Sequence, residues 1–170
     1  MSENTNIEVQ AAAERPVDVV VRKAVIQDVP LIAAIINAFA AKGLMLARSQ
    51  HHLYQFLRDF VVATVDGVPV GCGALSIVWA DIAEIRSLAV AEPWQGRGLG
   101  RRMVTFLLQE ARELGVPAVF ALTYQQGFFE RMGFHKVPNE SLPHKIWGDC
   151  LNCPKFPNCD ETAMLIRLEA

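Results

Sequence analysis

The pattern of apolar and polar positions divides the first half of the chain into short elements. A β-branched run at Val17–Val21 predicts a strand. Apolar residues at helical spacing over 31–39 predict a helix with Asp28 as its cap, and those over 53–60 predict a second helix. Two further strands within 61–75 flank an Asp-Gly pair, which is typical of a tight hairpin.

The second half of the chain continues this alternation. In chain order, the pattern predicts a strand over 82–90, a helix that ends near Leu114, a strand over 118–123, a short helix over 128–132, and strands over 134–137 and 162–168. Strands and helices in this uneven order are typical of an α+β domain built on one mixed sheet.

Length and composition limit the classes of protein that fit. A chain of 170 residues has a single-domain length, and its apolar fraction of 52% supplies a core. The net charge of −2 does not favour sequence-independent binding to nucleic acid, and no apolar run approaches the ~20 residues of a membrane span. We expect residues 1–15 to be a flexible polar tail, not a secretory signal, and residues 16–170 to form one domain.

The four cysteines divide into Cys72 and a late cluster of Cys150, Cys153 and Cys159, in a loop that we place at 142–160. An exported disulfide scaffold is usually shorter and richer in cysteine, so this content favours a reducing cytoplasm. Two thiols at CxxC spacing form half of a zinc or iron–sulfur site. Candidates for a fourth ligand are His135, His144, Asp149 and Asp160. A structural metal, free or buried thiols, and a redox pair all remain open.

A glycine-rich turn separates the strand over 82–90 from the helix that follows it. Its sequence, Gln95-Gly-Arg-Gly-Leu-Gly-Arg101, places backbone N–H groups at a helix N-terminus, where an anion is favoured. Glycines let an anion approach the backbone, and Arg97, Arg101 and Arg102 add positive charge at the mouth of the turn. The turn is neither a Walker loop nor a dinucleotide fingerprint, because its spacing differs from both. A phosphate cradle and a plain tight turn are the two interpretations.

Two motifs resemble those of the GNAT acetyltransferase family. Gln-x-x-Gly-x-Gly from Gln95, after a strand that ends Leu88-Ala89-Val90, is similar to the acyl-CoA-binding motif, and Glu130–Phe134 resembles the late helix and the start of the next strand. The resemblance covers Val19–Val137. It implies a GNAT fold of the α+β class, in which helices flank a mixed, mostly antiparallel sheet that is splayed between its fourth and fifth strands. It also implies acetyl-CoA as co-substrate, bound by Leu88, Ala89, Val90, Gln95, Gly96, Arg97, Gly98, Leu99, Gly100, Arg101 and Phe129.

Three further segments resemble a narrower group, the short-form amino-acid N-acetyltransferases that make N-acetylglutamate. These segments are 42–49, 83–90, and 122–124 together with 128–129. The resemblance implies that the acetyl group moves to the α-amine of L-glutamate.

A dicarboxylic acceptor needs cationic groups to bind it, and arginine binds carboxylates through two parallel hydrogen bonds. The candidates are Arg48, Arg86 and, in the late loop, Lys145. Arg86 shares a strand face with Glu84, so an internal ion pair between them is the alternative. For Arg48 and Lys145 the alternative is a solvated loop charge.

The transfer chemistry needs a base for the acceptor amine and gains from an acid for the leaving thiolate. Glu84 is the candidate base, acting through one water. Many family members carry their strand glutamate two positions later, where this chain has Arg86. They also often carry a tyrosine where this chain has Phe129, so Tyr124 is the substitute candidate acid, and departure of CoA as the thiolate is the alternative.

Together these features predict a cytoplasmic N-acetyltransferase that makes N-acetylglutamate for arginine synthesis by direct attack in a ternary complex. A homodimer is a further expectation. The alternatives are a GNAT enzyme acting on another amino acid, a polyamine or a protein amine, and a CoA-sensing or interaction module.

Overall fold

The computed structural model of the chain describes residues 16–142, 149–155 and 158–169. Seven strands in these ranges form one sheet in the order β1-β2-β3-β4-β5-β7-β6. Their bounds are β1 (Val19–Lys23), β2 (Phe60–Val65), β3 (Val68–Trp79), β4 (Ile82–Val90), β5 (Ala118–Thr123), β6 (His135–Val137) and β7 (Thr162–Arg167). The expected tail at 1–15 and the acceptor candidate Lys145 lie outside the described residues.

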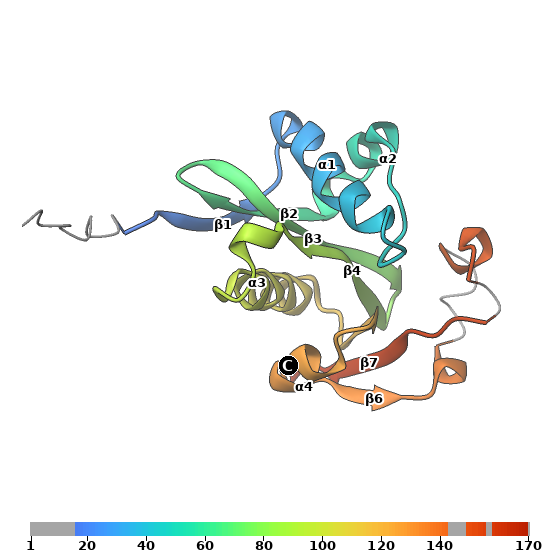
Figure 1. The fold of residues 1–170 in the computed structure, drawn as a ribbon. Coiled ribbons are helices and arrows are strands. Elements are labelled where there is room, and N and C mark those ends of the chain that lie inside the picture. The colour runs from blue at the N-terminus through green and yellow to red at the C-terminus, as the bar shows by residue number, and fades with distance from the viewer. Residues whose placement is uncertain (1–15, 143–148, 156–157, 170) are drawn as a thin grey trace, which may run out of the picture.

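Helices cover both faces of the sheet (Figure 1). On one face lie α1 (Val29–Ala40) and α2 (Gln50–Gln55), and on the other lies α3 (Leu99–Leu114). The short helix α4 (Gln126–Arg131) packs beside β6 and β7. The predicted α+β class, with its mixed and mostly antiparallel sheet, is confirmed.

Each face of the sheet has its own hydrophobic core. Ile36 of α1 and Leu53 of α2 are buried with Phe60 on one face. Met103 of α3 is buried with Val61 on the other. Successive side chains of a strand point to opposite faces, so β2 is buried on both sides and reads as a continuous apolar run.

The predicted bounds of β4 and β5 match the structure, but the second helix was predicted too long. The helix α2 ends at Gln55, and a 3₁₀ turn, η2 (Leu57–Asp59), follows it. Phe60 then begins β2, because its side chain is needed in the core beneath α1, where it is 1% exposed. The apolar residues over 53–60 show helical spacing because the α-helix α2 is followed almost directly by the 3₁₀ turn η2, and the two have similar periodicity.

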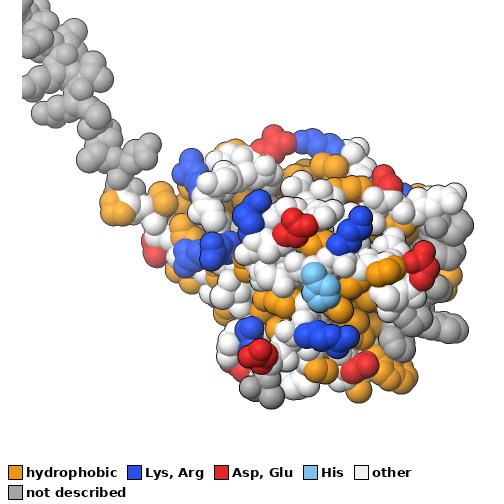
Figure 2. Space-filling view, turned by 90° about the horizontal axis from the view of Figure 1, so that it is seen from below, with side chains coloured by type: hydrophobic (Ala, Val, Ile, Leu, Met, Phe, Trp, Pro, Cys, Tyr) orange, Lys and Arg blue, Asp and Glu red, His pale blue; other side chains and the backbone are white. Residues whose placement is uncertain are grey.

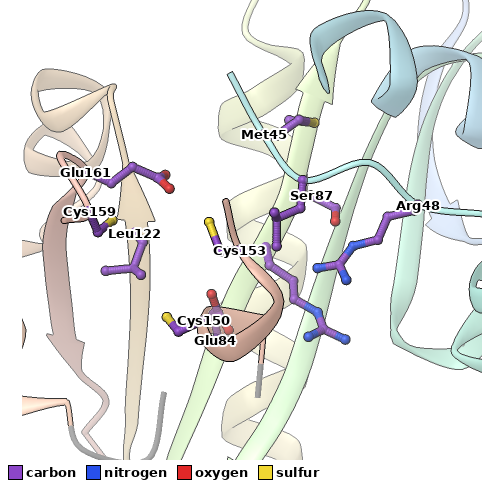
Figure 3. A pocket seen from close by; sticks show the side chains of 11 residues that line it. Met45, Arg48, Glu84, Ser87, Leu122, Cys150, Cys153, Cys159 and Glu161 are labelled. Carbon is purple, nitrogen blue, oxygen red and sulfur yellow. The ribbon is translucent and has the colours of Figure 1, made fainter. Parts of the chain in front are cut away.

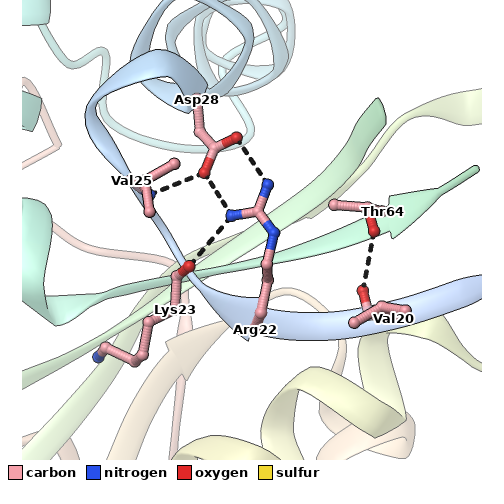
Figure 4. A network of polar contacts seen from close by, with 6 residues as sticks. All are labelled: Val20, Arg22, Lys23, Val25, Asp28 and Thr64. Carbon is pink, nitrogen blue, oxygen red and sulfur yellow. Dashed lines mark hydrogen bonds and ion pairs between the residues drawn. The ribbon is translucent and has the colours of Figure 1, made fainter. Parts of the chain in front are cut away.

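Asp28 precedes α1, as expected, but its side chain does not cap that helix. The carboxylate instead accepts hydrogen bonds of 2.7 and 3.0 Å from the Arg22 guanidinium and one of 2.8 Å from the Val25 N–H (Figure 4). Burial alone would raise the pKa of Asp28, but these hydrogen bonds and the Arg22 charge together bring it below its usual value of 3.8. The carboxylate therefore ties β1 to the start of α1.

The sheet is splayed at its centre, as expected. Strands β4 and β5 run parallel and pair only at Ala83 with Val119 and at Glu84 with Phe120. Beyond Glu84 the two strands diverge, so β1–β4 form one half of the sheet and β5–β7 the other (Figure 1).

The surface carries charges of both signs. Figure 2 shows lysine and arginine side chains mixed with aspartate and glutamate on one face, with apolar side chains between them. Among the described residues, none of the helices combines the length and apolarity that a membrane span requires.

Candidate functional site

A cleft of about 660 Å³ opens where β4 and β5 diverge. One wall is the end of β4, and the other is formed by the end of β5 and by α4. The glycine-rich turn lies at its mouth. Ten of the eleven residues expected to bind acetyl-CoA line this cleft: Leu88, Ala89, Val90, Gln95, Gly96, Gly98, Leu99, Gly100, Arg101 and Phe129.

The eleventh, Arg97, is not among the residues that line the cleft. Its guanidinium lies 4.7 Å from the centre of the Trp94 ring, which is a cation–π contact. The neighbouring Arg102, which the sequence also placed at the mouth, donates a 3.0 Å hydrogen bond to the Val19 carbonyl of β1. Of the three arginines expected at the mouth, Arg101 is the one that lines the cleft, and the helix N-terminus adds to its positive charge.

The turn has the backbone geometry of an anion cradle. Gly96 and Gly98 have φ angles of 74° and 82°, which side chains rarely adopt. Gly98 is the N-cap of α3, so the first N–H groups of that helix have no partner within the helix, and the residues of this first turn line the cleft. The Gln95 side chain donates a 2.9 Å hydrogen bond to the Val90 carbonyl and fastens the turn to β4. These features fit the pyrophosphate of CoA.

Strand β4 is distorted where it meets the cleft. Its register with β3 shifts between Arg86 and Ala89, and Ser87 lies in the left-handed region with a φ of 54°. The Ser87 carbonyl accepts a hydrogen bond of 3.4 Å from the Cys72 thiol of β3. The bulge interrupts the pairing with β3 at Ser87 and Leu88, and the pairing resumes at Ala89 and Val90, where the co-substrate is expected to pair with β4.

Phe129 stands where many GNAT members have a tyrosine, and it is a core residue in this chain. Its side chain is 4% exposed, and its ring lies edge-on to Phe128 and Phe134 at 5.1 and 5.0 Å. Phe129 lines the cleft with an apolar surface and offers no proton.

A smaller pocket of about 100 Å³ lies beside the cleft and brings the acceptor candidates together (Figure 3). Arg48 reaches it from the loop before α2, and Glu84 and Arg86 reach it from β4. The remaining lining residues are Met45, Leu46, Ser87, Leu122, Cys150, Cys153, Cys159 and Glu161.

Contacts of Arg48 itself and of its neighbours in the loop hold the Arg48 backbone in place. The side-chain amide of Asn37 in α1 donates to the Arg48 carbonyl at 2.9 Å and accepts from the Arg48 N–H at 3.0 Å. The next residue, Ser49, caps α2 by accepting a 3.1 Å hydrogen bond from the His52 N–H. An ion pair between Lys42 and Glu92 ties the same loop to the segment after β4. The backbone at Arg48 is therefore fixed before any acceptor binds.

Glu84 and Arg86 share one face of β4, as their spacing predicts. Glu84 is 4% exposed. The Arg86 guanidinium lies 5.9 Å from the centre of the Phe56 ring. Burial raises the pKa of the nearby Asp59 carboxyl, and the positive charge of Arg86 partly offsets this shift. Arg86 therefore lines the pocket and also lies close enough to Asp59 for its charge to act on that carboxyl.

The segment after η6 (Asp149–Asn152) connects the two sides of the site through Lys155. Its ammonium donates a 3.1 Å hydrogen bond to the Gly43 carbonyl in the loop after α1, and it lies 3.5 Å from the Asp160 carboxylate. It also lies 4.3 Å from the centre of the Tyr124 ring. The Tyr124 hydroxyl donates a 2.6 Å hydrogen bond to Asp160. This segment is thus fastened to both halves of the splayed sheet.

Sequence reasoning missed Asn37, Lys155 and Glu161. Asn37 interrupts an apolar helix, which is a signal that a polar side chain is needed there, but its partner lies outside the helix.

A metal site was one hypothesis for the cysteine cluster. Among the described residues, no group of three or more His, Cys, Asp or Glu is placed to hold a metal ion. His144, one of the proposed ligands, lies outside the described residues.

The chain is similar in sequence to known acetyltransferases. Residues 35–134 match the Acetyltransferase (GNAT) family. An uncharacterised N-acetyltransferase of Chlorobaculum tepidum is 43% identical over 148 residues, which cover 87% of this chain and 96% of that protein. An amino-acid acetyltransferase of Mycobacterium tuberculosis is 38% identical over 141 residues, which cover 80% of each.

Solved structures resemble this fold closely. A Mycobacterium tuberculosis protein in complex with CoA has a TM-score of 0.75 and 33% identity, and the match covers 88% of this chain and 99% of that one. The N-acetylglutamate synthase of Neisseria gonorrhoeae, in complex with coenzyme A and N-acetyl-glutamate, has a TM-score of 0.80 and 29% identity. That match covers 92% of this chain and 36% of the Neisseria chain, so this protein corresponds to about a third of that enzyme.

Proposed function

The chain belongs to the GNAT acetyltransferase family and is an acetyl-CoA-dependent N-acetyltransferase, and we propose that its acceptor is the α-amine of L-glutamate. The product, N-acetyl-L-glutamate, would then supply arginine synthesis. Support comes from relatives named amino-acid acetyltransferase and from a structural neighbour that holds coenzyme A and N-acetyl-glutamate.

The observation that carries this proposal is the convergence of Arg48 and Arg86 on one small pocket beside the co-substrate cleft. The two guanidinium groups come from different elements, one from the loop before α2 and one from β4. An acceptor with two carboxylates can engage both, because each guanidinium binds a carboxylate through two parallel hydrogen bonds. Glu84 and Glu161 also line the pocket, so an acceptor that carries both an amine and carboxylates matches its charges better than a polyamine does.

Glu84 is our candidate base for the acceptor amine. It lies on β4 in the same pocket and is buried, so a water or an amine next to it is screened little by solvent. Glu84 accepts the amine proton through one water, and the freed amine attacks the thioester carbonyl directly. The C–N bond forms, the C–S bond breaks, and no acyl-enzyme is needed. In this scheme a backbone N–H near Val90 polarises the carbonyl.

Tyr124 is our candidate acid, at the end of β5 and in the wall of the cleft. Its hydroxyl proton is donated to Asp160, so Tyr124 must turn from this carboxylate to reach the leaving thiolate. Departure of CoA as the thiolate is the alternative. An unchanged kcat in the Tyr124→Phe variant would favour that alternative.

The test of the acceptor is CoA release, measured by chromatography because the protein's own thiols would react with a thiol dye. Acetyl-CoA is held fixed against glutamate, glutamine, aspartate, arginine, spermidine and a lysine peptide. We expect turnover with glutamate to exceed the others. A preference for spermidine or the peptide, or no turnover despite acetyl-CoA binding, would overturn the proposal.

Variants of the two arginines sharpen this test. We expect Arg86→Gln to raise the KM for glutamate by about 10-fold to 100-fold and to leave the KM for acetyl-CoA unchanged, because a charge-assisted hydrogen bond contributes about 1.5–3 kcal/mol. Arg48→Gln is expected to act in the same direction. Arg58→Gln, on the exposed side of η2, is the matched control and is expected to leave both constants unchanged.

A further inference from the structure

The wall of the acceptor pocket contains three thiols. Cys150 reaches it from η6, Cys153 from the residue directly after η6, and Cys159 from the segment before β7. All three are half-buried, and none of the four cysteines of the chain forms a disulfide. Sequence spacing had left the role of these thiols open, and the fold places them beside the residues proposed to bind and deprotonate the acceptor.

The thiols are held at the pocket by the contacts of their own segment. Lys155, two residues after Cys153, binds the Gly43 carbonyl on one side of the site. Asp160, next to Cys159, accepts the hydrogen bond from Tyr124 on the other side. The thiol-bearing segment is therefore anchored at both ends of the pocket, and a change in its shape would be transmitted to the space that the acceptor occupies.

Cys150 and Cys153 are placed to form a disulfide within one turn. The Cys153 N–H donates a 3.2 Å hydrogen bond to the Cys150 carbonyl. In a turn closed in this way, the first and fourth Cα atoms lie within about 7 Å, and a disulfide spans about 4.4–6.8 Å. Figure 3 shows both sulfur atoms on the same side of the turn, toward Leu122 and Cys159.

Cys72 provides an internal contrast. It is 0% exposed on β3, and burial raises the pKa of its thiol to about 12. A buried thiol that stays protonated is inert, whereas a thiol that reaches a pocket is open to small reagents.

We propose that Cys150 and Cys153 form a reversible oxidation site in the wall of the acceptor pocket, with a low-molecular-weight disulfide as the oxidant. One thiolate attacks the disulfide, forms a mixed disulfide and releases one thiol. The second cysteine then attacks the protein sulfur of that mixed disulfide and releases the other thiol. The pair loses two electrons and two protons, and the small disulfide gains them.

The consequence for activity rests on the proposed function. The new S–S bond replaces two thiols in the wall and constrains η6, so the pocket changes while the glycine-rich turn does not. Oxidation therefore raises the KM for the acceptor and leaves the KM for acetyl-CoA unchanged. Formation of the disulfide itself does not depend on which acceptor the enzyme uses.

The first readout is the mass of the intact protein after exposure to glutathione disulfide. We expect wild type to lose the mass of two hydrogen atoms, to yield a peptide that joins Cys150 to Cys153, and to recover on reduction. Cys153→Ser is expected to stop at the glutathione adduct, and Cys159→Ser is expected to form the bond like wild type. A half-buried cysteine tolerates serine, and the melting temperature of each variant checks this.

Several outcomes would overturn the assignment. They are an unchanged mass in wild type, a bond from Cys159 in place of Cys153, and a stoichiometric metal that co-purifies with the protein and is lost in Cys150→Ser. The second readout is the KM for the acceptor before and after oxidation. If the enzyme uses an acceptor other than glutamate, the disulfide still forms, and the KM is measured with that acceptor, so failure of the proposed function is seen separately.

Discussion

The side-chain amide of Asn37 makes both of its hydrogen bonds to the backbone of Arg48, eleven residues later in the chain. The amide donates to the Arg48 carbonyl and accepts from the Arg48 N–H, as a backbone amide in a β-sheet would. These two bonds fix the orientation of the Arg48 backbone and therefore the direction of its side chain. Asn37 lies in α1, which is packed on the sheet, so the guanidinium is held relative to β4 by a rigid element. We infer that Asn37 is a positioning residue for the acceptor.

Replacing Asn37 by alanine is expected to raise the KM for glutamate about 5-fold to 30-fold, because about 1–2 kcal/mol of backbone restraint is lost. The KM for acetyl-CoA is expected to stay the same. Steady-state kinetics with each substrate varied in turn measures both. Leu31→Ala, on the exposed face of the same helix, is the control. Equal effects on the two KM values would contradict the positioning role.

Glu84→Gln is expected to lower kcat by about 100-fold or more, since a positioned general base contributes about that much. The acidic limb of the pH–rate profile is expected to disappear with it, because the group that must lose a proton is gone. The profile of kcat against pH, measured on both proteins, checks this. Glu113→Gln, exposed on α3, is the control. A variant that keeps the wild-type profile would remove Glu84 from the mechanism.

Gly98→Ala tests the anion cradle. Nothing lies within 4 Å of the position that the new Cβ would occupy, but the φ angle of 82° is strained for alanine by about 1–2 kcal/mol. We expect the Kd for CoA to rise by roughly 5-fold to 30-fold in calorimetric titration. Gly67→Ala, in the hairpin between β2 and β3, has a φ of 83° and equally open space, so it carries the same strain away from the turn. A similar loss of CoA affinity in both variants would argue against a local role for Gly98.

Asp28→Asn is expected to lower the free energy of unfolding at pH 7 by about 1–3 kcal/mol, because a buried hydrogen-bonded carboxylate is lost. The pKa of Asp28 is lowered in the folded state, so its contribution is present above the unfolded value of 3.8 and is lost as pH falls below it. Urea unfolding at several pH values should therefore show wild type and variant converging below pH 3.8. Asp81→Asn, in the exposed turn between β3 and β4, is the control, and a constant difference down to pH 3 would contradict this assignment.

Patterns within a few residues of one another predicted most of this fold. The bounds of β4, β5 and the end of α3 follow from local periodicity and from the glycine at 115, which takes a φ of 79°. The cradle was predicted for the same reason, since its residues are consecutive. Phe60 was misassigned because periodicity cannot separate the end of a helical turn from the start of a buried strand.

The features that sequence reasoning missed depend on contacts between distant residues. Asp28 was expected to cap its own helix, but Arg22 on β1 supplies a stronger partner. Arg102 was expected at the mouth of the cleft, but β1 offers it a carbonyl. The cysteines were recognised as a cluster, and only the fold places them at the acceptor pocket.

The two-residue pairing between β4 and β5 has a thermodynamic consequence. Few backbone hydrogen bonds join the two halves of the sheet at this point. A ligand that contacts both walls of the cleft binds only while both halves are folded. A higher free concentration of that ligand therefore raises the free energy of unfolding of the whole chain. Cellular levels of the acyl donor would thus influence how long the enzyme survives proteolysis as well as how fast it turns over.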